Sequence, residues 1–143
     1  MRRRHLLALL LLGLTPRVVA QEPGEFVLIA NSGRPEVALS RDEASRIFLR
    51  KELSWPQGGE VRPVDQSADL PVRERFSEAV HGRSAQVILR YWLQQVFAGR
   101  GTPPPALQSD AEVLEYVART PGALGYVSSG TRLAGVKTLK LRD

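Results

Sequence analysis

A polar segment from Asp65 to Arg73 carries the residue types best suited to hold an anion. It reads Asp65-Gln66-Ser67-Ala68-Asp69-Leu70-Pro71-Val72-Arg73 and leads from a strand-like run into the first turn of a predicted helix. At a helix N-terminus, unbonded backbone amides and the helix dipole favour negative charge. A hydroxyl and guanidinium groups in the first turns would add further donors. The candidate ligand site therefore comprises Ser67, Asp69, Arg73 and Arg75.

The same segment carries features that oppose an anion. Pro71 has no amide hydrogen to donate, and Asp65 and Asp69 place negative charge where an anion would sit. A structural interpretation therefore stays open beside the first. In it, Asp69 caps the helix and Pro71 fills its first turn, as both residue types prefer.

Other kinds of site chemistry find little support in the sequence. There is no cysteine, and His81 is the only histidine after the N-terminal 20 residues, so the usual ligand set of a zinc site is missing. His81 stands at a predicted helix end, and nothing near it in the sequence suggests the nucleophile or the carboxylate of a catalytic triad. No Gly-x-x-x-x-Gly-Lys-Ser/Thr loop occurs. We expect no catalytic residues, no metal and no cofactor, and hence no enzyme.

Aromatic residues offer a second place to look for a ligand. Tyr91, Trp92 and Phe97 lie on one very apolar predicted helix, where they could form a stacking platform, but their spacing is more typical of a core. Trp55, close to a proline and two glycines, is the better candidate for a partly exposed aromatic. A position at the edge of the core is nevertheless the favoured interpretation of Trp55.

Alternating strands and helices must position these residues. Short apolar or alternating runs predict strands at Phe26 to Ala30, Glu60 to Asp65, Leu124 to Val127 and Val136 to Leu141. Helices are predicted to begin after the capping residues Ser40, Ser84 and Ser109, and a further one to run from about Val72 to Gly82. The helix after Ser84 is apolar on all but one stripe, which predicts that it is mostly buried. Strands separated by helices predict an α/β layer fold, with these residues buried: Phe48, Phe76, Ile88, Trp92, Val113 and Tyr126.

The first 20 residues have the pattern of a cleavable signal peptide. Arg2 to Arg4 form a positive start, Leu6 to Leu14 an apolar stretch, and Val18-Val19-Ala20 ends in a small residue. The apolar stretch falls short of the roughly 20 residues that cross a bilayer as a helix, so an uncleaved anchor is the less favoured alternative. We predict a signal peptide at residues 1–20 with cleavage after Ala20, one domain at residues 25–143, a periplasmic location and no stable membrane insertion.

Loss of the signal peptide would change the charge balance. Removing its four arginines from the 20 basic residues leaves 16 against 15 acidic residues, a net charge of +1 in place of +5. A nearly neutral chain lacks the electrostatic footprint of nucleic-acid binding. We therefore expect no nucleic-acid partner.

Two sequence motifs carry a family resemblance. The run Ile47-Phe48-Leu49-Arg50-Lys51-Glu52-Leu53-Ser54-Trp55 is similar to an "iF-G-K---W" pattern, and Pro121-Gly122-Ala123-Leu124-Gly125-Tyr126-Val127 is similar to "pGaiGYv". Both patterns belong, in this order, to the periplasmic phosphate-binding proteins of bacterial ABC importers. From roughly Phe26 to Arg142 the chain resembles their second lobe. The resemblance implies a single three-layer-like α/β domain, like one lobe of a type II periplasmic binding protein.

The resemblance also implies an oxyanion loop with the pattern "R---SGT---F" at the candidate site. Phe76 matches its closing aromatic residue. Asp65 stands where the arginine would be, and Leu70-Pro71-Val72 stands where Ser-Gly-Thr would be. The lobe that would supply the other wall of a binding cleft has no counterpart in the sequence.

Two functions are therefore expected to compete. In the first, the protein is a non-enzymatic phosphate- or oxyanion-binding-like protein associated with ABC-type phosphate uptake or sensing. In the second, it has lost solute binding and is a periplasmic interaction module that docks on another protein or on a second copy of itself. Fold alone does not decide between them.

Overall fold

The computed structural model describes Gly13 and residues 25–143, so the predicted signal peptide lies outside the described residues apart from Gly13. The strands are β1 (Phe26–Asn31), β2 (Ala38–Ser40), β3 (Arg62–Pro63), β4 (Asp65–Gln66), β5 (Ala106–Leu107), β6 (Ala123–Ser128) and β7 (Val136–Arg142). The helices are α1 (Arg41–Phe48), α2 (Pro71–Phe76), α3 (Ala85–Phe97) and α4 (Asp110–Arg119), and α2 runs on into a π-helical turn, η1 (Ser77–His81).

Five strands form a mixed sheet in the order β2-β7-β1-β6-β3. The three central strands pair antiparallel, with Leu28 opposite Tyr126 on β6 and opposite Leu139 on β7. The outer strands β2 and β3 each pair parallel with their neighbour. Two further strands of two residues each, β4 and β5, pair parallel with each other and form a separate small sheet.

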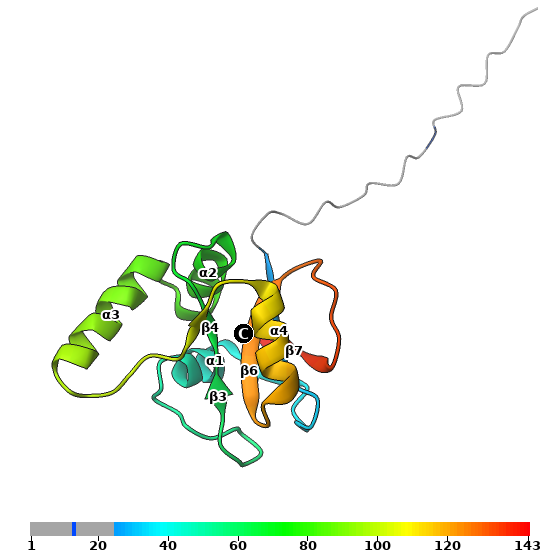
Figure 1. The fold of residues 1–143 in the computed structure, drawn as a ribbon, viewed down its shortest axis with the longest axis horizontal. Helices are drawn as coiled ribbons and strands as arrows, with labels where there is room; N and C mark the ends of the chain where they lie inside the picture. Colours follow the sequence, from blue (N-terminus) through cyan, green and yellow to red (C-terminus); the bar gives the residue numbers. More distant parts are fainter. Residues whose placement is uncertain (1–12, 14–24) are drawn as a thin grey trace, which may run out of the picture.

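Helices cover both faces of the sheet and give three layers. Successive residues of a strand point to opposite faces, so Leu28 and Ala30 pack with α1 and α2, while Ile29 packs with α4. Figure 1 shows α4 crossing over β6, with α3 standing apart at the side of the molecule. This three-layer α/β arrangement confirms the predicted fold class, and the six residues predicted to be buried are buried.

Local capping explains where the helices begin. The hydroxyls of Ser40, Ser84 and Ser109 each accept a hydrogen bond from the backbone amide three residues later. These bonds satisfy amides that the first helical turn leaves without a partner. The three predicted helix starts are therefore confirmed. Gly82, which takes the left-handed conformation at φ 67°, ends η1 as predicted.

The two family motifs meet in space. The indole nitrogen Nε1 of Trp55 donates to the backbone oxygen of Gly122 over 2.9 Å, although 67 positions separate the two residues. Gly122 has φ +79°, and a Cβ there would lie 2.5 Å from the backbone oxygen of Glu60. Only glycine fits this approach without backbone movement. The motifs thus build one joint between the loop after α1 and the start of β6.

The structure tests two predictions about aromatic residues and burial. The favoured interpretation of Trp55, a position at the core, is confirmed, and the alternative of a partly exposed ring is wrong: Trp55 is 2% exposed, packs in the core, and has the Arg34 guanidinium 4.9 Å from its ring centre. The prediction that α3 is mostly buried is wrong. Only Ala85, Ile88 and Trp92 of α3 are buried, because the helix touches the body along one narrow face.

The predicted strand from Glu60 to Asp65 is also divided. The amides of Arg62 and Val64 donate to Gly122 and Leu124 at the start of β6, but the amide of Asp65 donates to the oxygen of Pro105 and so begins the pair with β5. The pairing partner changes within three residues. Strands β2 and β5, with three and two residues, give no recognisable sequence pattern and were not predicted.

Candidate functional site

The four residues of the candidate site lie on the loop before α2 and on α2 itself, but their side chains have different surroundings. The hydroxyl of Ser67 donates to the carboxylate of Asp69, and both are at the surface or partly exposed. Arg73 is buried, with 6% of its surface exposed. Arg75 is exposed and lines a shallow hollow with Pro71, Glu74 and Glu78. The hydroxyl and the buried guanidinium therefore already have protein partners.

A buried carboxylate occupies the centre of the predicted oxyanion loop. Asp65, which is 4% exposed, lies with its Oδ1 atom 3.2 Å from Nη1 of Arg73. The same oxygen accepts a hydrogen bond from the hydroxyl of Tyr126 and one of 3.0 Å from the backbone amide of Gln66. A cation, a hydroxyl and an amide converging on one point are the donors expected for a bound oxyanion. Here the chain's own carboxylate takes them.

Burial and charge act in opposite directions on Asp65. Burial raises the pKa of its carboxyl, while Arg73, the Tyr126 hydroxyl and the Gln66 amide oppose that rise. Burial, together with the nearby Asp65, raises the pKa of Tyr126, so its hydroxyl stays protonated and remains a donor. Arg73 also donates to the backbone oxygen of Gln66 over 2.7 Å. The guanidinium thus fixes both the carboxylate and the backbone of the loop.

A second carboxylate, that of Asp110, lines a cavity beside the loop. Asp110 accepts bonds of 2.9 Å from the side chain of Gln66 and from the amide of Ser128. Burial acts to raise the pKa of Asp110, but these bonds and that of Thr131 outweigh it and lower the pKa. A cavity of about 360 Å³ lies between Asp110 and the start of α2, lined also by Gln66, Leu70, Pro71, Val72, Gln108, Ser109 and Ser128. This cavity presents a negative charge and no cation.

The start of α2 offers little to an anion. Pro71 stands at the first helical position, and the amides of Arg73 and Glu74 both donate to the oxygen of Leu70. The predicted placement of Pro71 is confirmed, but the alternative that Asp69 caps the helix is wrong. The capping position is occupied by Leu70, whose side chain has no polar atom, and the carboxylate of Asp69 accepts a hydrogen bond from Ser67.

His81 has a partner that the sequence did not reveal. Its Nδ1 atom lies 2.8 Å from the hydroxyl of Ser45 on α1, and the ring edge packs on Phe76. Burial and then the charge of Arg73 lower the pKa of His81 from 6.5 to about 4. The neutral imidazole therefore links α1 to η1 at pH 7. The prediction that nothing near His81 resembles a nucleophile is corrected, although no carboxylate bonds the ring within the part of the chain that the structure describes.

A surface that sequence reasoning missed lies between α3 and the segment that follows α1. One hollow of about 480 Å³ is lined by Leu49, Lys51, Arg83, Val87, Ile88, Arg90, Tyr91 and Gln94. A second, of about 410 Å³, shares Leu49, Lys51 and Tyr91 with it and adds Arg50, Leu53, Trp92, Gln95, Arg100, Gly101 and Thr102. We call the two hollows together the basic groove. Its sequence signal is the absence of any Asp or Glu from Ala79 to Ser109.

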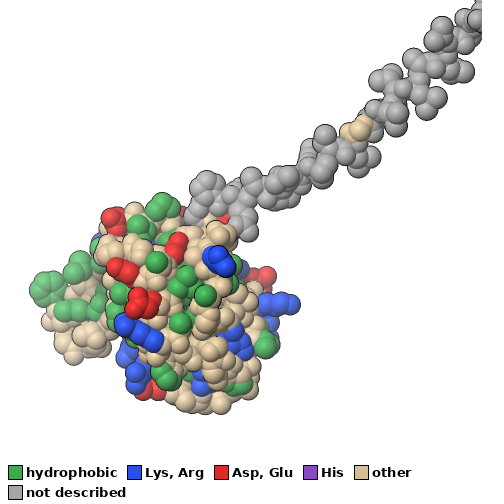
Figure 2. Space-filling model, turned by 45° about the vertical axis from the view of Figure 1, so that its right-hand side comes forward, with side chains coloured by type: hydrophobic (Ala, Val, Ile, Leu, Met, Phe, Trp, Pro, Cys, Tyr) green, Lys and Arg blue, Asp and Glu red, His purple; other side chains and the backbone are tan. Residues whose placement is uncertain are grey.

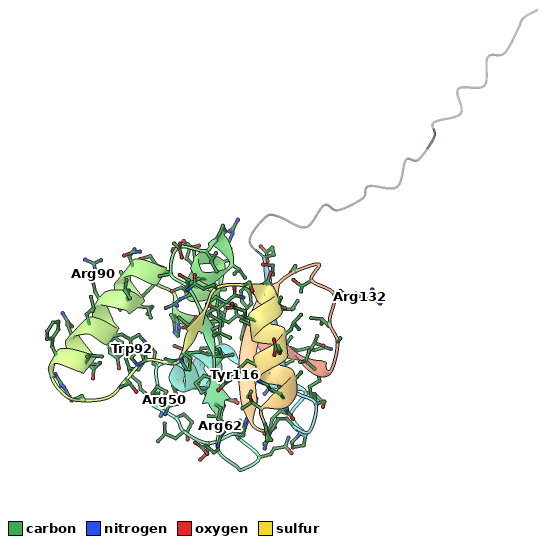
Figure 3. All side chains as sticks on the ribbon, viewed as in Figure 1. Arg50, Arg62, Arg90, Trp92, Tyr116 and Arg132 are labelled. Carbon is green, nitrogen blue, oxygen red and sulfur yellow. The ribbon has the colours of Figure 1, made fainter. Side chains whose placement is uncertain are left out.

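The opposite flank of α3 is apolar and exposed. Phe97 is 89% exposed, and Leu89, Leu93 and Val96 are also exposed. Figure 2 shows apolar side chains on the projection that α3 forms at the left edge. Trp92 instead turns towards the body, while Arg90 turns away from it (Figure 3). The three aromatic residues of α3 thus form no common platform, because Trp92 is buried, Tyr91 is half-buried and Phe97 is exposed.

Within the described residues, no group of three or more potential metal ligands occurs. None of the helices in that part of the chain is long and apolar enough to span a membrane.

Comparison with known proteins identifies the fold. No protein-family model matches the chain, and no curated protein matches it. Among solved structures, an ABC-type phosphate transport receptor from Vibrio cholerae superposes with a TM-score of 0.63 at 18% identity, over 82% of this chain and 46% of the receptor. A phosphate ABC transporter substrate-binding protein with bound phosphate, from Clostridium perfringens, superposes with a TM-score of 0.62 at 19% sequence identity, over 82% of this chain and 44% of that protein. PstS from Borrelia burgdorferi superposes with a TM-score of 0.57 at 14% sequence identity, over 82% of this chain and 47% of PstS.

The chain spans less than half the length of these structures and has the fold of one of their lobes.

Proposed function

We propose that this protein is a non-enzymatic interaction module, built on one lobe of the phosphate-receptor fold, that does not take up free phosphate by itself. The observation that carries the proposal is the buried Asp65 carboxylate, held by Arg73, Tyr126 and the amide of Gln66. An incoming phosphate would have to displace this carboxylate or share the donors with it. Two negative groups in one buried site repel each other strongly.

The surroundings of the loop support the same proposal. Asp110 makes the adjacent cavity negative, and Pro71 removes one amide from the start of α2. The one lobe formed by the described residues could contact a bound anion from one side only. Each charge-assisted hydrogen bond that is lost weakens binding by about 1.5–3 kcal/mol, so two or three such losses would turn micromolar affinity into millimolar or weaker.

Exposed apolar side chains indicate how the module would act. Four of them follow one flank of α3, and the largest, Phe97, is almost entirely in water. Exposed aromatic and aliphatic residues gathered on one element are typical of surfaces that contact other proteins. We propose that the partner is a periplasmic protein, because the N-terminal pattern at residues 1–20 is that of an export signal.

Phosphate binding is the second candidate, and the solved structures favour it, since one of them contains bound phosphate. In that case Ser67, Asp69, Arg73 and Arg75 would form the ligand site, after Asp65 had released Arg73. Such a release would leave the Asp65 carboxyl buried without its cation.

Isothermal titration with phosphate at low ionic strength decides between the two. We expect no heat of binding below millimolar phosphate, for the native protein and for Arg73→Ala alike. Micromolar binding that Arg73→Ala abolishes would overturn the module and establish an oxyanion receptor. A titration of Asp65→Asn serves as the matched variant, because it removes the internal negative charge and keeps the shape of the side chain.

A further inference from the structure

We propose that the basic groove binds an acidic segment of a protein partner, with carboxylates of that segment on Lys51, Arg83 and Arg90 and an apolar or aromatic side chain against Tyr91. The inference rests on the proposed function as an interaction module and names the chemistry of its partner. It concerns a different surface from the loop around Asp65.

The cations of the groove lack the carboxylate partners that five other arginines have. Arg34, Arg41, Arg62, Arg73 and Arg119 each form an ion pair. Within the described residues, no ion pair involves the five cations of the groove, which are all exposed: Arg50, Lys51, Arg83, Arg90 and Arg100. No carboxylate lines either hollow. Glu52, the nearest acid in the sequence, lines a separate hollow beside Trp55.

The groove combines this charge with an apolar floor. Leu49, Val87 and Ile88 line the larger hollow together with the cations, and Leu49, Val87 and Ile88 are each buried or partly buried. The ammonium group of Lys51 lies 5.9 Å from the centre of the Tyr91 ring, so the half-buried ring stands between the two hollows. An occupant that carried only charge would leave this floor in water. One that also carries an apolar side chain would bury it.

Backbone conformation adds a further observation. Arg50 has φ 58°, in the left-handed region, where it alone among the described non-glycine residues has a positive φ. A residue with a side chain is disfavoured there, and glycine is the usual choice after a helix end. The chain carries a guanidinium at this strained position, on the wall of the smaller hollow.

Exposure decides which kind of anion suits the groove. Water screens each of these cations, so one small anion such as phosphate would gain little from any of them. An extended segment with several carboxylates engages the cations together and gains from each. The cations also line a concave groove, whereas a membrane presents a flat surface. These points favour a peptide segment over a free phosphate or a lipid headgroup.

Fluorescence anisotropy with a defined peptide tests the inference. The probe is a fluorescein-labelled decapeptide with six glutamates, one leucine and one phenylalanine, and the control probe has glutamines in place of the glutamates. We expect saturable binding of the acidic peptide only. Arg83→Glu combined with Arg90→Glu should weaken it about tenfold or more, since two contacts become repulsive. Tyr91→Ala should weaken it about threefold through lost apolar contact.

Arg132→Glu is the matched control for charge. Arg132 is exposed and lies on the far side of the molecule from Arg90 (Figure 3), so Arg132→Glu changes the net charge by the same amount as the single reversal Arg83→Glu, without touching the groove. The expected effect on peptide binding is less than twofold. Equal weakening by Arg132→Glu and by Arg83→Glu would show non-specific attraction and overturn the inference, as would an acidic peptide that does not bind.

Vesicles of phosphatidylglycerol and phosphatidylcholine test whether the groove binds a membrane instead of a peptide. We expect no sedimentation of the protein with them at the ionic strength of the peptide assay. Vesicle binding that the double reversal abolishes, in the absence of peptide binding, would identify a membrane as the occupant and reject the acidic segment. Phosphate titration remains a separate measurement, because phosphate bound at the Asp65 loop would contradict the module and leave the peptide result at the groove unchanged.

Discussion

The carboxylate of Asp65 and the guanidinium of Arg73 are both removed from water, so each depends on the other. Asp65→Asn would leave the Arg73 charge buried beside a neutral amide, and we expect it to lower the free energy of unfolding by about 3 kcal/mol or more. Urea denaturation measures the change. Glu60→Gln is the control, because Glu60 pairs with Arg62 at 3.5 Å on the surface and should cost less than about 1 kcal/mol. A similar small loss for both variants would show that the buried pair adds no stability.

His81 should make the protein sensitive to mild acid. Its pKa in the fold, about 4, lies below its ordinary value of 6.5, so the unfolded chain takes up a proton first as the pH falls. Its contribution to stability is therefore complete above pH 6.5 and is lost as the pH falls towards 4. The loss amounts to at most about 3 kcal/mol.

Denaturation of native protein and of His81→Asn at a series of pH values tests this. The variant should show a flatter stability profile between pH 6.5 and 4, because asparagine does not titrate. Parallel profiles would mean that His81 titrates at its ordinary pKa in the fold, and that the carboxylates alone set the acid limit.

At the scale of elements, α3 divides its aromatic residues between two roles. Trp92→Ala should destabilise the domain by about 3–5 kcal/mol, because Trp92 is 6% exposed and is the largest buried side chain of α3. Phe97→Ala, five residues further on the same helix, should change stability by less than about 0.5 kcal/mol. Thermal or urea denaturation of both variants checks the contrast. A loss below about 1 kcal/mol for Trp92→Ala would place its ring on the surface.

Elements whose ends depend on neighbouring residues could be predicted from the sequence. Ser40, Ser84 and Ser109 bond amides three positions away, and such local bonds are visible in the spacing. The burial of α3 could not be predicted in the same way. Its apolar composition fits a core helix, and only the tertiary arrangement shows that one flank has no covering element.

The candidate site shows the same limit. The sequence placed Asp65 and Arg73 in one segment. It did not show that Tyr126, 61 positions away, donates a hydrogen bond to the Asp65 carboxylate, which thereby takes the place expected for a bound anion. Ser45 and His81 are 36 positions apart, and no sequence pattern joins them. The run without acidic residues after Ala79 was visible in the sequence, yet Arg50 and Lys51 join it only because the fold brings the segment after α1 beside α3.

At the scale of the whole molecule, export is the prediction to test. The signal pattern at residues 1–20 predicts that the protein in a periplasmic extract begins at Gln21. Mass spectrometry of the intact chain measures this directly. A chain that retains Arg2 to Arg4 and stays with the membrane fraction would contradict both the cleavage and the periplasmic location. A variant with Leu6 to Leu9 replaced by glutamine serves as the control and should remain unprocessed.

The two edge strands of the five-stranded sheet have a consequence for self-association at high concentration. At the edge formed by β3, Arg62 and the following Val64 donate inward, to Gly122 and Leu124, so the residue whose amide would point outward is Pro63, which has no amide hydrogen. At the other edge of the sheet, β2 is only three residues long. Short or proline-bearing margins resist the addition of a further strand from another chain. At high concentration, these two edges therefore disfavour fibril growth by the addition of strands to the five-stranded sheet.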